Sequence, residues 1–389
     1  MIAFDESNNC INCVSHTAKI TVLGVGGAGN NTVNGMIDAN DIANVTFIAA
    51  NTDSQALEHC RASTKIQLGI KLTKGLGSGA NPEVGKRAAE EDLDKLIELI
   101  GDADLVFLAA GMGGGTGSGA LPVIARALRE RGILTVAFVT KPFGFEGKRR
   151  ERVAQQAIKE LQENVDTLIV IPNQKLLDCA SNDIAMVDAF NLVNDILNQS
   201  VKGISYIITK AGHINVDFAD LRAIMKDMGR AVMGTGRASG HDRAIQATQT
   251  AISSPLLENM SIRGAKGVLI NVSGGLSLSL QEINQAASVV YEQADPDANI
   301  ILGSVIDENI GDELIVTVVA TGCTTDEMPV VKTKPATVVE EAVKNSGLQR
   351  EVESEQPSLV AANQAELDSV DIPAFLRHGN SAERDITEE

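Results

Sequence analysis

The sequence predicts an α/β protein with a doubly wound parallel sheet in its first half, a long connecting helix, a second and smaller α/β domain, and a disordered C-terminal linker and tail. Short apolar runs alternate with amphipathic segments over the first half, which is typical of strands and helices wound into a parallel sheet. Glycine-rich loops lie between these segments. After residue 323 the apolar periodicity is lost, and acidic, polar and Ala-rich residues predict a disordered linker.

The composition fits two folded domains with tails, because 389 residues are more than one domain normally holds. Hydrophobic residues make up 44% of the chain, which is ample for two cores. Aromatic residues make up only 3%, with no Trp, so Ala, Ile, Leu and Val must fill those cores. The net charge of −18 argues against nucleic acid as a partner, because phosphate backbones select basic surfaces.

Targeting and redox signals are few. No segment has the apolar length of a membrane span and no signal peptide opens the sequence, so we expect a cytoplasmic protein. Five scattered cysteines fit a reducing compartment. Cys10 and Cys13 form a CxxC that suits metal or redox chemistry, but no second pair completes a zinc site. We favour a flexible, solvated N-terminal extension over residues 1–17.

The first half reads as strands separated by helices. Apolar runs predict strands at residues 18–23, 45–50, 105–110, 133–140 and 167–171. Helical spacing predicts helices through residues 33–37 and at residues 82–100, 120–131 and 151–161. A long helix at residues 185–201 then leaves the first domain, with an apolar stripe formed by Phe190, Val193, Ile196 and Leu197.

The second half begins with a short strand expected near residues 206–208. An acidic turn and a helix at residues 221–228 follow. Further strands are predicted at residues 267–272, 300–306 and 314–320, with a helix near residues 281–291. The chain then divides into an extension (1–17), a first domain (18–182), a connecting helix (183–205), a second domain (206–323), a linker (324–370) and a tail (371–389).

A nine-residue run, GMGGGTGSG at residues 111–119, lies between a buried strand and an apolar helix. Backbone N–H groups at a helix start, approached closely through glycines, form phosphate sites. Glycine runs also occur as flexible linkers, but a linker would not sit between two such elements. No G-x-x-x-x-G-K-[ST] occurs, so backbone N–H groups and Mg²⁺, rather than a P-loop lysine, must meet the phosphate charge.

Two more loops carry the same signal. A G-x-G-x-x-G at residues 24–29 follows the first strand, and KGLGSGANP occupies residues 74–82. Asp53 follows the second strand, where a dinucleotide-binding unit would use it on a ribose, so this first unit alone leaves NAD and GTP open. Ligands of doubly wound sheets bind at the carboxyl ends of strands. We therefore expect all three glycine-rich loops to lie together at the carboxyl edge of the sheet. A Rossmann oxidoreductase that binds NAD needs only one such loop, so the other two favour GTP.

The segment GGGTGSG at residues 113–119 resembles the signature of the tubulin and FtsZ superfamily, and its neighbours are similar to bacterial FtsZ. The resemblance runs from Lys19 to Gly322, with a further match near the C-terminus. It implies a GTPase that converts GTP to GDP and phosphate with Mg²⁺, and that polymerises head-to-tail with itself into protofilaments. It also implies a place in the division ring at midcell, in the cytoplasm.

The same resemblance implies which residues bind GTP. They are Gly26, Gly27, Ala28, Gly29, Asn30, Asn31, Ser78, Gly79, Gly114, Gly115, Thr116, Gly117, Ser118, Glu146, Arg150, Asn173, Phe190, Asn194 and Asp195. Asp195 would accept hydrogen bonds from the guanine base, and the amides of Asn31 and Asn173 would complete its recognition. The ring of Phe190 would pack beside the base.

Plainer interpretations remain open for some of these residues. Glu146 and Arg150 have the spacing of an ordinary i,i+4 pair. Asp195 has the spacing of a solvated helix face. The family often has Asp after the Asn at position 173, whereas this chain has Gln174, which changes the rim of the base pocket but leaves Asn173 intact.

Asp217 and Asp220 are three residues apart at the start of a predicted helix, where carboxylates also act as caps and complement the helix dipole. The stretch NVDFADLRAIM at residues 215–225 is similar to the synergy loop of FtsZ, which completes the active site of the next subunit. By this resemblance Asp217 and Asp220 polarise a water in line with the γ-phosphate, with Asn215 nearby. A monomer would then hold half a site, and hydrolysis would require assembly into open filaments.

The tail resembles the adaptor-binding peptide of the family. The matching residues are Asp371, Ile372, Pro373, Ala374, Phe375, Leu376 and Arg377. Ile372, Phe375 and Leu376 can form the apolar face of a short helix that begins at Pro373 and binds in a groove of a partner. The alternative is that they are apolar residues without a function at a disordered chain end. We expect membrane-adaptor and division-regulator proteins as partners. Membrane contact would be indirect, because the acidic linker should not bind anionic lipid.

Two other functions would account for part of the sequence. An NAD-dependent oxidoreductase would use only the first glycine unit, and it leaves the loop at residues 111–119 unexplained. A filament protein that binds GTP without hydrolysing it would have no need of both Asp217 and Asp220.

Overall fold

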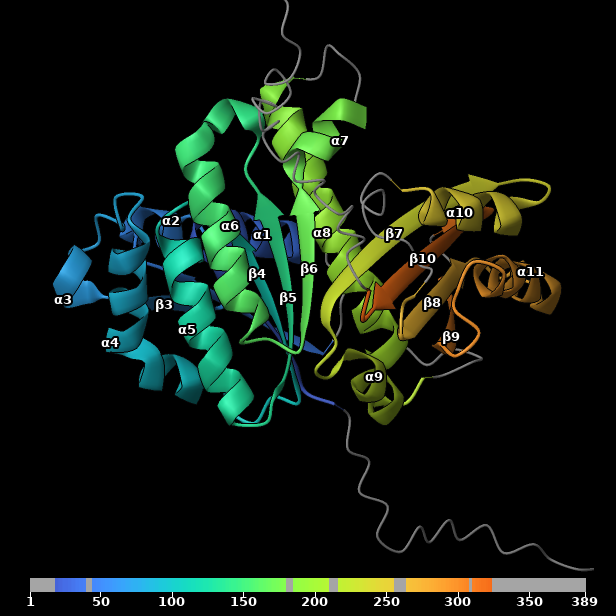
Figure 1. The fold of residues 1–389 in the computed structure, drawn as a ribbon, viewed down its shortest axis with the longest axis horizontal. Coiled ribbons are helices and arrows are strands. Elements are labelled where there is room, and N and C mark those ends of the chain that lie inside the picture. The colour runs from blue at the N-terminus through green and yellow to red at the C-terminus, as the bar shows by residue number, and fades with distance from the viewer. Residues whose placement is uncertain are drawn as a thin grey trace, which may run out of the picture. The chain divides into compact units, whose positions relative to one another are not determined.

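The computed structural model describes residues 18–39, 44–179, 185–209, 216–254, 264–307 and 310–323, with only the backbone of Ala39 and Cys179. Its strands form one ten-stranded sheet in the order β3-β2-β1-β4-β5-β6-β7-β10-β8-β9 (Figure 1). The strands are β1 (Ile20–Val25), β2 (Val45–Asn51), β3 (Thr64–Gln67), β4 (Leu105–Gly111), β5 (Leu134–Lys141), β6 (Thr167–Pro172), β7 (Gly229–Ser239), β8 (Gly267–Gly274), β9 (Asn299–Ile306) and β10 (Glu313–Thr321).

The helices lie between these strands in the way a doubly wound sheet requires. They are α1 (Gly26–Ala39), α2 (Ser54–Glu58), α3 (Ile70–Thr73), α4 (Pro82–Ile100), α5 (Thr116–Glu130), η1 (Gly144–Glu146), α6 (Lys148–Gln162), α7 (Asn173–Cys179), α8 (Met186–Thr209), α9 (Phe218–Met225), α10 (Arg243–Ile252) and α11 (Leu280–Tyr291). Every strand pair from β3 to β7 is parallel. The predicted α/β class with a doubly wound parallel sheet is therefore confirmed.

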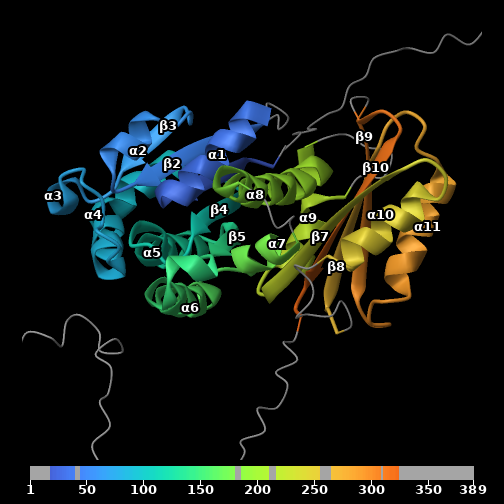
Figure 2. The ribbon, with the colours of Figure 1, turned by 90° about the horizontal axis from the view of Figure 1, so that it is seen from above.

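The parallel half of the sheet is covered on both faces, as Figure 2 shows. Because side chains alternate along a strand, Ile20 and Val22 pack with α1, α2 and α8, whereas Leu23 and Val25 pack with α4, α5 and α6. Almost all of these strand residues are buried. Covering both faces is what makes the strand sequences continuously apolar.

The second half continues the same sheet with a different pattern. β10 runs antiparallel to both β7 and β8, and β9 is parallel to β8. α10 and α11 cover one face around a third core. Residues of α8 and α9 cover the other face and share one core with the first half.

The structure corrects several expected elements. No strand forms at residues 206–208, because α8 continues to Thr209, with Tyr206 and Ile207 buried against the sheet. The helix expected at residues 120–131 begins at Thr116, inside the glycine run. β7 and α10 were not predicted from the sequence. The extension, the linker and the tail lie outside the described residues.

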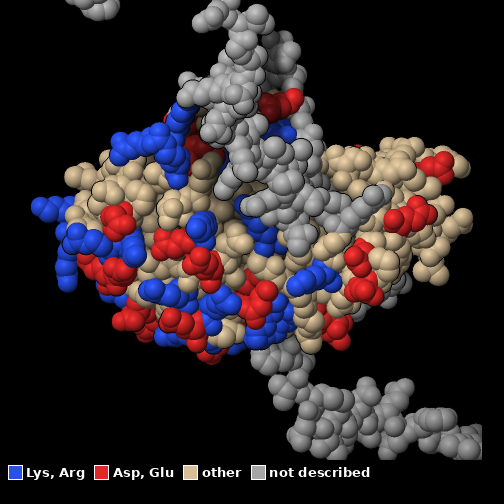
Figure 3. Space-filling view, viewed as in Figure 1, with Lys and Arg blue, Asp and Glu red and all other residues tan. Residues whose placement is uncertain are grey.

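Charged side chains are unevenly spread over the described surface. In the view of Figure 3, Lys, Arg, Asp and Glu intermingle over the parallel half, whereas the visible face of the second half carries few of them. Among the helices that the structure describes, none is long and apolar enough to span a membrane.

Candidate functional site

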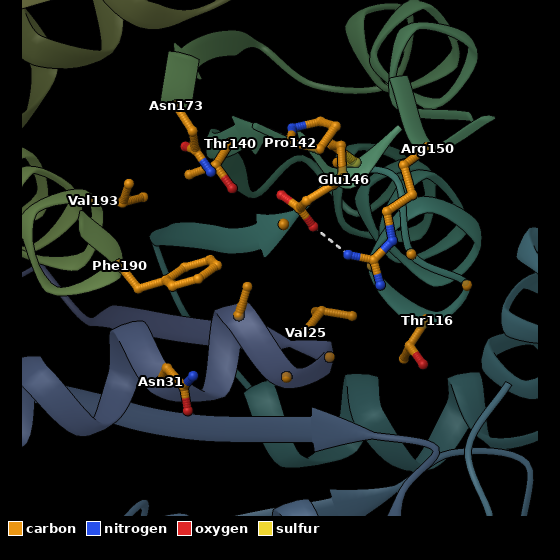
Figure 4. Close-up of a pocket in the computed structure, with 18 of the residues that line it drawn as sticks. Val25, Asn31, Thr116, Thr140, Pro142, Glu146, Arg150, Asn173, Phe190 and Val193 are labelled. Atoms are coloured by element: carbon orange, nitrogen blue, oxygen red, sulfur yellow. Dashed lines mark hydrogen bonds and ion pairs between the residues drawn. The ribbon is translucent and has the colours of Figure 1, made fainter. Parts of the chain in front are cut away.

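A cleft of about 490 Å³ opens where the parallel strands of the first half end (Figure 4). It lies over the carboxyl ends of β1 and β4, the two neighbouring strands between which the strand order reverses. Such a reversal point is where doubly wound sheets bind ligands. The lining residues are Val25, Gly26, Gly27, Ala28, Asn31, Ser78, Gly111, Met112, Gly114, Gly115, Thr116, Gly117, Thr140, Pro142, Glu146, Arg150, Asn173, Phe190, Val193, Asn194 and Leu197.

The first wall of the cleft is the turn from β1 into α1. Gly26 has a φ of +73°, which favours glycine, and a Cβ there would lie 3.2 Å from the backbone nitrogen of Gly117. Gly27 has no atom within 4 Å of the position that its Cβ would occupy, so its backbone is open to the cleft. α1 begins at this turn, and its first N–H groups have no partner within the helix.

The second wall is the turn from β4 into α5. Gly113 has a φ of +102°, and its N–H donates to Oγ of Ser118 at 2.8 Å. α5 begins three residues later at Thr116. Gly114 again has nothing within 4 Å of its Cβ position. The starts of α1 and α5 thus meet at one cleft, and paired helix starts with open glycine backbone bind anions such as phosphates.

Three hydroxyl groups from three segments meet beside these glycines. Oγ1 of Thr116 lies 2.7 Å from Oγ1 of Thr52 and 3.1 Å from Oγ of Ser78. Thr52 is fully buried, whereas Ser78 and Thr116 line the cleft. The loop at residues 74–82 is therefore joined to the start of α5 through side chains.

The third wall comes from the segment after β5. Glu146 and Arg150 form an ion pair, and Oε1 of Glu146 accepts a hydrogen bond from the backbone N–H of Phe143 at 2.9 Å. Glu146 and Arg150 thus form the ordinary i,i+4 ion pair that their spacing allows. Both residues also line the cleft. Oε1 of Gln174 accepts from the N–H of Gly144 at 3.0 Å, which fastens this segment to α7.

The end of the cleft opposite Arg150 is formed by Asn173 and α8, as Figure 4 shows. Asn173 is 5% exposed, and its Oδ1 has no described hydrogen-bond partner. The ring of Phe190 is 39% exposed and meets the ring of Phe143 edge-on at 5.2 Å. An aromatic face beside an unsatisfied buried amide suits a flat heteroaromatic group with polar edges.

Fourteen of the residues expected to bind nucleotide line this cleft, and five do not. The five are Gly29, Asn30, Gly79, Ser118 and Asp195. Ser118 braces the Gly113 turn, as described above. A Cβ at Gly29 would lie 2.3 Å from the carbonyl oxygen of Ala109, so this glycine lets α1 pack closely on β4. Asp195 is exposed on α8, one residue beyond the lining residue Asn194.

Asn30 also acts beneath the cleft. It is buried, and with its amide oriented to match its neighbours its nitrogen donates to the carbonyls of Gly24 and Gly26, while its oxygen accepts from Asn51. It therefore holds the β1–α1 turn in shape.

Three acidic residues singled out from the sequence, Asp53, Asp217 and Asp220, do not line the cleft. Oδ1 of Asp53 accepts from the N–H groups of Gln55 and Ala56, which makes Asp53 the N-cap of α2. Asp217 and Asp220 are exposed at the start of α9, where Asp217 occupies the N-cap position without a side-chain capping bond. Asn215 lies outside the described residues.

α9 lies at the opposite edge of the sheet from the cleft. Its Arg222 donates to the carbonyl oxygen of Gly132, which comes just before β5, at 3.1 Å. Within one copy of the chain, the carboxylates of Asp217 and Asp220 are thus separated from the cleft by the length of the strands.

Seven lining residues are not among those expected to bind nucleotide: Val25, Gly111, Met112, Thr140, Pro142, Val193 and Leu197. The first three do lie in the glycine-rich runs at residues 24–29 and 111–119. Most of the seven end a strand or follow one directly, so the carboxyl-edge argument contained the signal to find them. Val193 and Leu197 lie three and seven residues after Phe190 and so share its face of α8. They were interpreted as core.

Two family models match the chain. Residues 19–181 match the GTPase domain of the tubulin/FtsZ family, and residues 229–324 match the C-terminal domain of the FtsZ family. The Cell division protein FtsZ of Magnetospirillum gryphiswaldense is 52% identical over 304 residues, which are 78% of this chain and 54% of that protein. The chain therefore spans about half the length of this curated relative.

Solved structures of FtsZ and of a more distant protein are similar to the chain. An empty FtsZ dimer of M. jannaschii is 43% identical, with a TM-score of 0.76 over 79% of this chain and 89% of that chain. CetZ2 of Haloferax volcanii, in a protofilament with GTPγS bound, is 19% identical, with a TM-score of 0.68 over 80% of this chain and 95% of that chain. At that identity the second comparison shows a shared fold alone.

Proposed function

The chain belongs to the FtsZ family, and from that premise we propose that it binds GTP in the cleft, assembles head-to-tail with copies of itself and hydrolyses GTP in the assembled state. In the cell these filaments build the ring at the bacterial division site. The single observation that supports this proposal most is the cleft itself, where two helix starts and an aromatic–amide end lie at one edge of the sheet.

The cleft offers a different chemistry for each part of a nucleotide. The open backbone at Gly27 and Gly114 and the positive ends of α1 and α5 suit the phosphates. Glu146 and Arg150, on the third wall, suit the ribose and the adjoining phosphate. Phe190 and the unsatisfied amide of Asn173 suit a purine and its polar edge.

Mg²⁺ is proposed to bind with the nucleotide, where it neutralises the phosphate charge that builds up during transfer. The cleft wall supplies oxygen donors, the hydroxyls of Ser78 and Thr116 and the carboxylate of Glu146, which are the donor type that Mg²⁺ prefers. Among the described residues, no cluster of three or more His, Cys, Asp or Glu is arranged to hold a metal ion.

Hydrolysis is proposed to use carboxylates from a second copy. The cleft and the start of α9 lie at opposite edges of the sheet, so stacking in one direction brings Asp217 and Asp220 of one copy to the cleft of the next. There they orient a water whose oxygen forms a bond to the γ-phosphorus as the bond to the β-phosphate oxygen breaks. One water proton stays on the released phosphate and the other leaves through a carboxylate to solvent, giving GDP and phosphate. Positioning provides most of the rate in such reactions, so ordinary carboxylates suffice.

The remaining parts of the proposal rest on the sequence. Residues 371–377 are proposed to bind membrane-adaptor and division-regulator proteins, which would tether a cytoplasmic filament at midcell. A dinucleotide-dependent oxidoreductase is less well supported, because Asp53 caps α2 and does not line the cleft.

The test follows assembly by right-angle light scattering while measuring released phosphate, after addition of Mg²⁺ with GTP, GDP or NAD. We expect scattering to rise with GTP and to decay as phosphate accumulates. In the Asp220→Ala variant, we expect filaments without phosphate release. A scattering rise without phosphate in the unaltered chain would remove the hydrolytic role, and binding of NAD without a response to GTP would overturn the proposal.

A further inference from the structure

We propose that Thr167 and Thr321 are positioning residues for hydrolysis, because their buried hydroxyls fix the carboxyl end of α9 and so the placement of Asp217 and Asp220. This inference rests on the proposed function. It concerns residues that lie in neither the cleft nor the acidic turn.

The last carbonyl groups of a helix have no partner within the helix and need one elsewhere. In α9, Oγ1 of Thr321 donates to the carbonyl oxygen of Ile224 at 2.7 Å, the shorter of its two acceptor contacts, the other being the carbonyl oxygen of Gly267 in β8 at 3.2 Å. Oγ1 of Thr167 donates to the carbonyl oxygen of Met225. Both threonines are 0% exposed. Water cannot replace either hydroxyl without a rearrangement of the surrounding core.

The two hydroxyls come from different parts of the sheet. Thr167 is the first residue of β6 in the parallel half, and Thr321 is the last residue of β10 in the second half. β7 lies between these two strands. The carboxyl end of α9 is therefore hydrogen-bonded to both halves of the molecule. Its position depends on how the two halves of the sheet are placed relative to each other.

Packing strengthens this arrangement on the second half. A Cβ at Gly267 of β8 would lie 3.1 Å from Cβ of Ile224, so α9 rests almost directly on the backbone of that strand. Leu221, Ile224 and Met225 are fully buried. The opposite end of the helix, with Asp217 and Asp220, is exposed and projects from this fixed base.

A catalytic role for those carboxylates requires accurate placement in the cleft of another copy. A misplacement of about 1 Å can lower a rate roughly a hundredfold. Loss of either anchoring hydroxyl leaves a buried carbonyl without a partner, and α9 shifts to find one. The expected defect is in the turnover of assembled protein, while the affinity for GTP is retained, because the affected helix and the cleft lie at opposite edges.

The experiment compares Thr321→Val and Thr167→Val with the unaltered full chain, measuring GTP affinity, assembly and phosphate release per assembled subunit. We expect release to fall about tenfold or more in each variant, with unchanged nucleotide affinity and filament mass. Thr321→Ser, which keeps the hydroxyl, should restore release. Thr317→Val removes a buried hydroxyl four residues earlier on the same strand, away from α9, and should behave like the unaltered chain.

A mixing measurement separates positioning from a general defect. Gly114→Asp places a negative charge in open space at the cleft without a clash, so that subunit should bind no nucleotide yet present a normal α9. Mixed with Thr321→Val, it should restore phosphate release from the intact clefts of the latter. Sedimentation would first establish that Gly114→Asp enters filaments together with Thr321→Val. If it does and release still does not recover, the defect lies in the cleft and the inference is overturned.

The outcomes distinguish this inference from the proposed function. If the unaltered chain does not hydrolyse GTP on assembly, the proposed function fails. If it does and a folded Thr321→Val matches it, only the positioning role fails. If Thr321→Val does not fold, Thr167→Val provides the test. Normal phosphate release by folded Thr167→Val would then overturn the inference.

Discussion

At the residue scale, Asn173 differs from the other cleft residues because it is buried and polar yet leaves its Oδ1 without a described partner. A buried unsatisfied amide destabilises the free chain. A ligand that completes its hydrogen bonds recovers that cost on binding. We therefore propose that Asn173 recognises the base directly, independently of the glycine loops that are proposed to bind the phosphates.

Replacing Asn173 with Asp keeps an acceptor oxygen at Oδ1 but removes the amide N–H₂, so no side-chain donor remains for a carbonyl oxygen of the base. We expect GTP binding to weaken about tenfold to a hundredfold. Isothermal titration with GTP would measure this. Asn271→Asp is the matched control, since Asn271 is also buried with an unpaired Oδ1 but lies far from the cleft, in β8. Equal losses in both variants would mean that the effect comes from stability.

A second residue-scale prediction concerns the ion pair of Arg243 and Glu282, which joins α10 to the start of α11 at 2.6 Å. The hydrogen bond from Arg243 lowers the pKa of Glu282 from 4.5 to about 2. The stabilisation from this lowered pKa is complete above pH 4.5 and is lost as the pH falls through about 2. We expect the unfolding free energy of the unaltered chain to approach that of Glu282→Gln over this range.

Urea denaturation at several pH values would measure the difference between the two proteins. In Arg243→Met the cation is absent, so a Glu282→Gln change added to it should show much less pH dependence. An unchanged pH dependence in that background would assign the effect to another group.

At the element scale, α4 and α5 approach so closely that two glycines are required between them. A Cβ at Gly119 would lie 2.0 Å from the carbonyl oxygen of Pro82, and one at Gly85 would lie 2.2 Å from the carbonyl oxygen of Gly115. This contact fixes the start of α5 against the loop that carries Ser78. The shape of the cleft beside Ser78 and Thr116 thus depends on packing outside it.

Gly119→Ala should lower the free energy of unfolding by roughly 1–3 kcal/mol or more, because the new Cβ meets backbone atoms of α4, which cannot move aside as a flexible side chain can. Gly114→Ala is the matched control, since its new methyl group meets nothing within 4 Å. It should leave stability within about 0.5 kcal/mol and instead weaken nucleotide binding. Denaturation curves and GTP titrations on both variants would test this, and a reversed pattern would contradict the assignment.

The apolar strands and the long helices of the first half were predictable because each has a strong apolar period. β3, α2, α3 and α7 were not predicted, since each spans seven residues or fewer and none shows such a period. β7 was missed since Gly234 and Gly236 interrupt its pattern, and it forms because β6 and β10 pair with it on both sides. The end of α8 was wrongly expected to be a strand, because Tyr206, Ile207 and Ile208 have high strand propensity. Tertiary packing decides both cases, and a local sequence pattern does not contain it.

For the cleft, the sequence identified loops better than individual roles. Glycine motifs located the walls, but the motifs could not distinguish Gly114, which faces the cleft, from Gly29, which packs against β4. That difference depends on what lies opposite each Cα. The buried braces Asn30 and Ser118 were indistinguishable from ligand contacts for the same reason.

At the scale of the whole molecule, one continuous sheet separates the cleft from the acidic start of α9. In the proposed mechanism a complete hydrolytic site needs two copies, so phosphate release per subunit should rise steeply with protein concentration. Dilution below the assembly threshold should reduce it close to zero. Turnover measured across a dilution series would test this, and a constant value per subunit would show that one copy suffices.

The two unlike edges of the sheet also give any stack of copies a direction. In the proposed filament, the terminal subunit at one end presents an uncovered cleft, and the terminal subunit at the other end presents a bare α9. Interior clefts are covered by the next subunit, so spent nucleotide can be exchanged with solution only where a cleft is uncovered. In each filament, the subunits that assembled earlier would then hold GDP. They would keep it until the filament shortens and their own clefts become uncovered at its end.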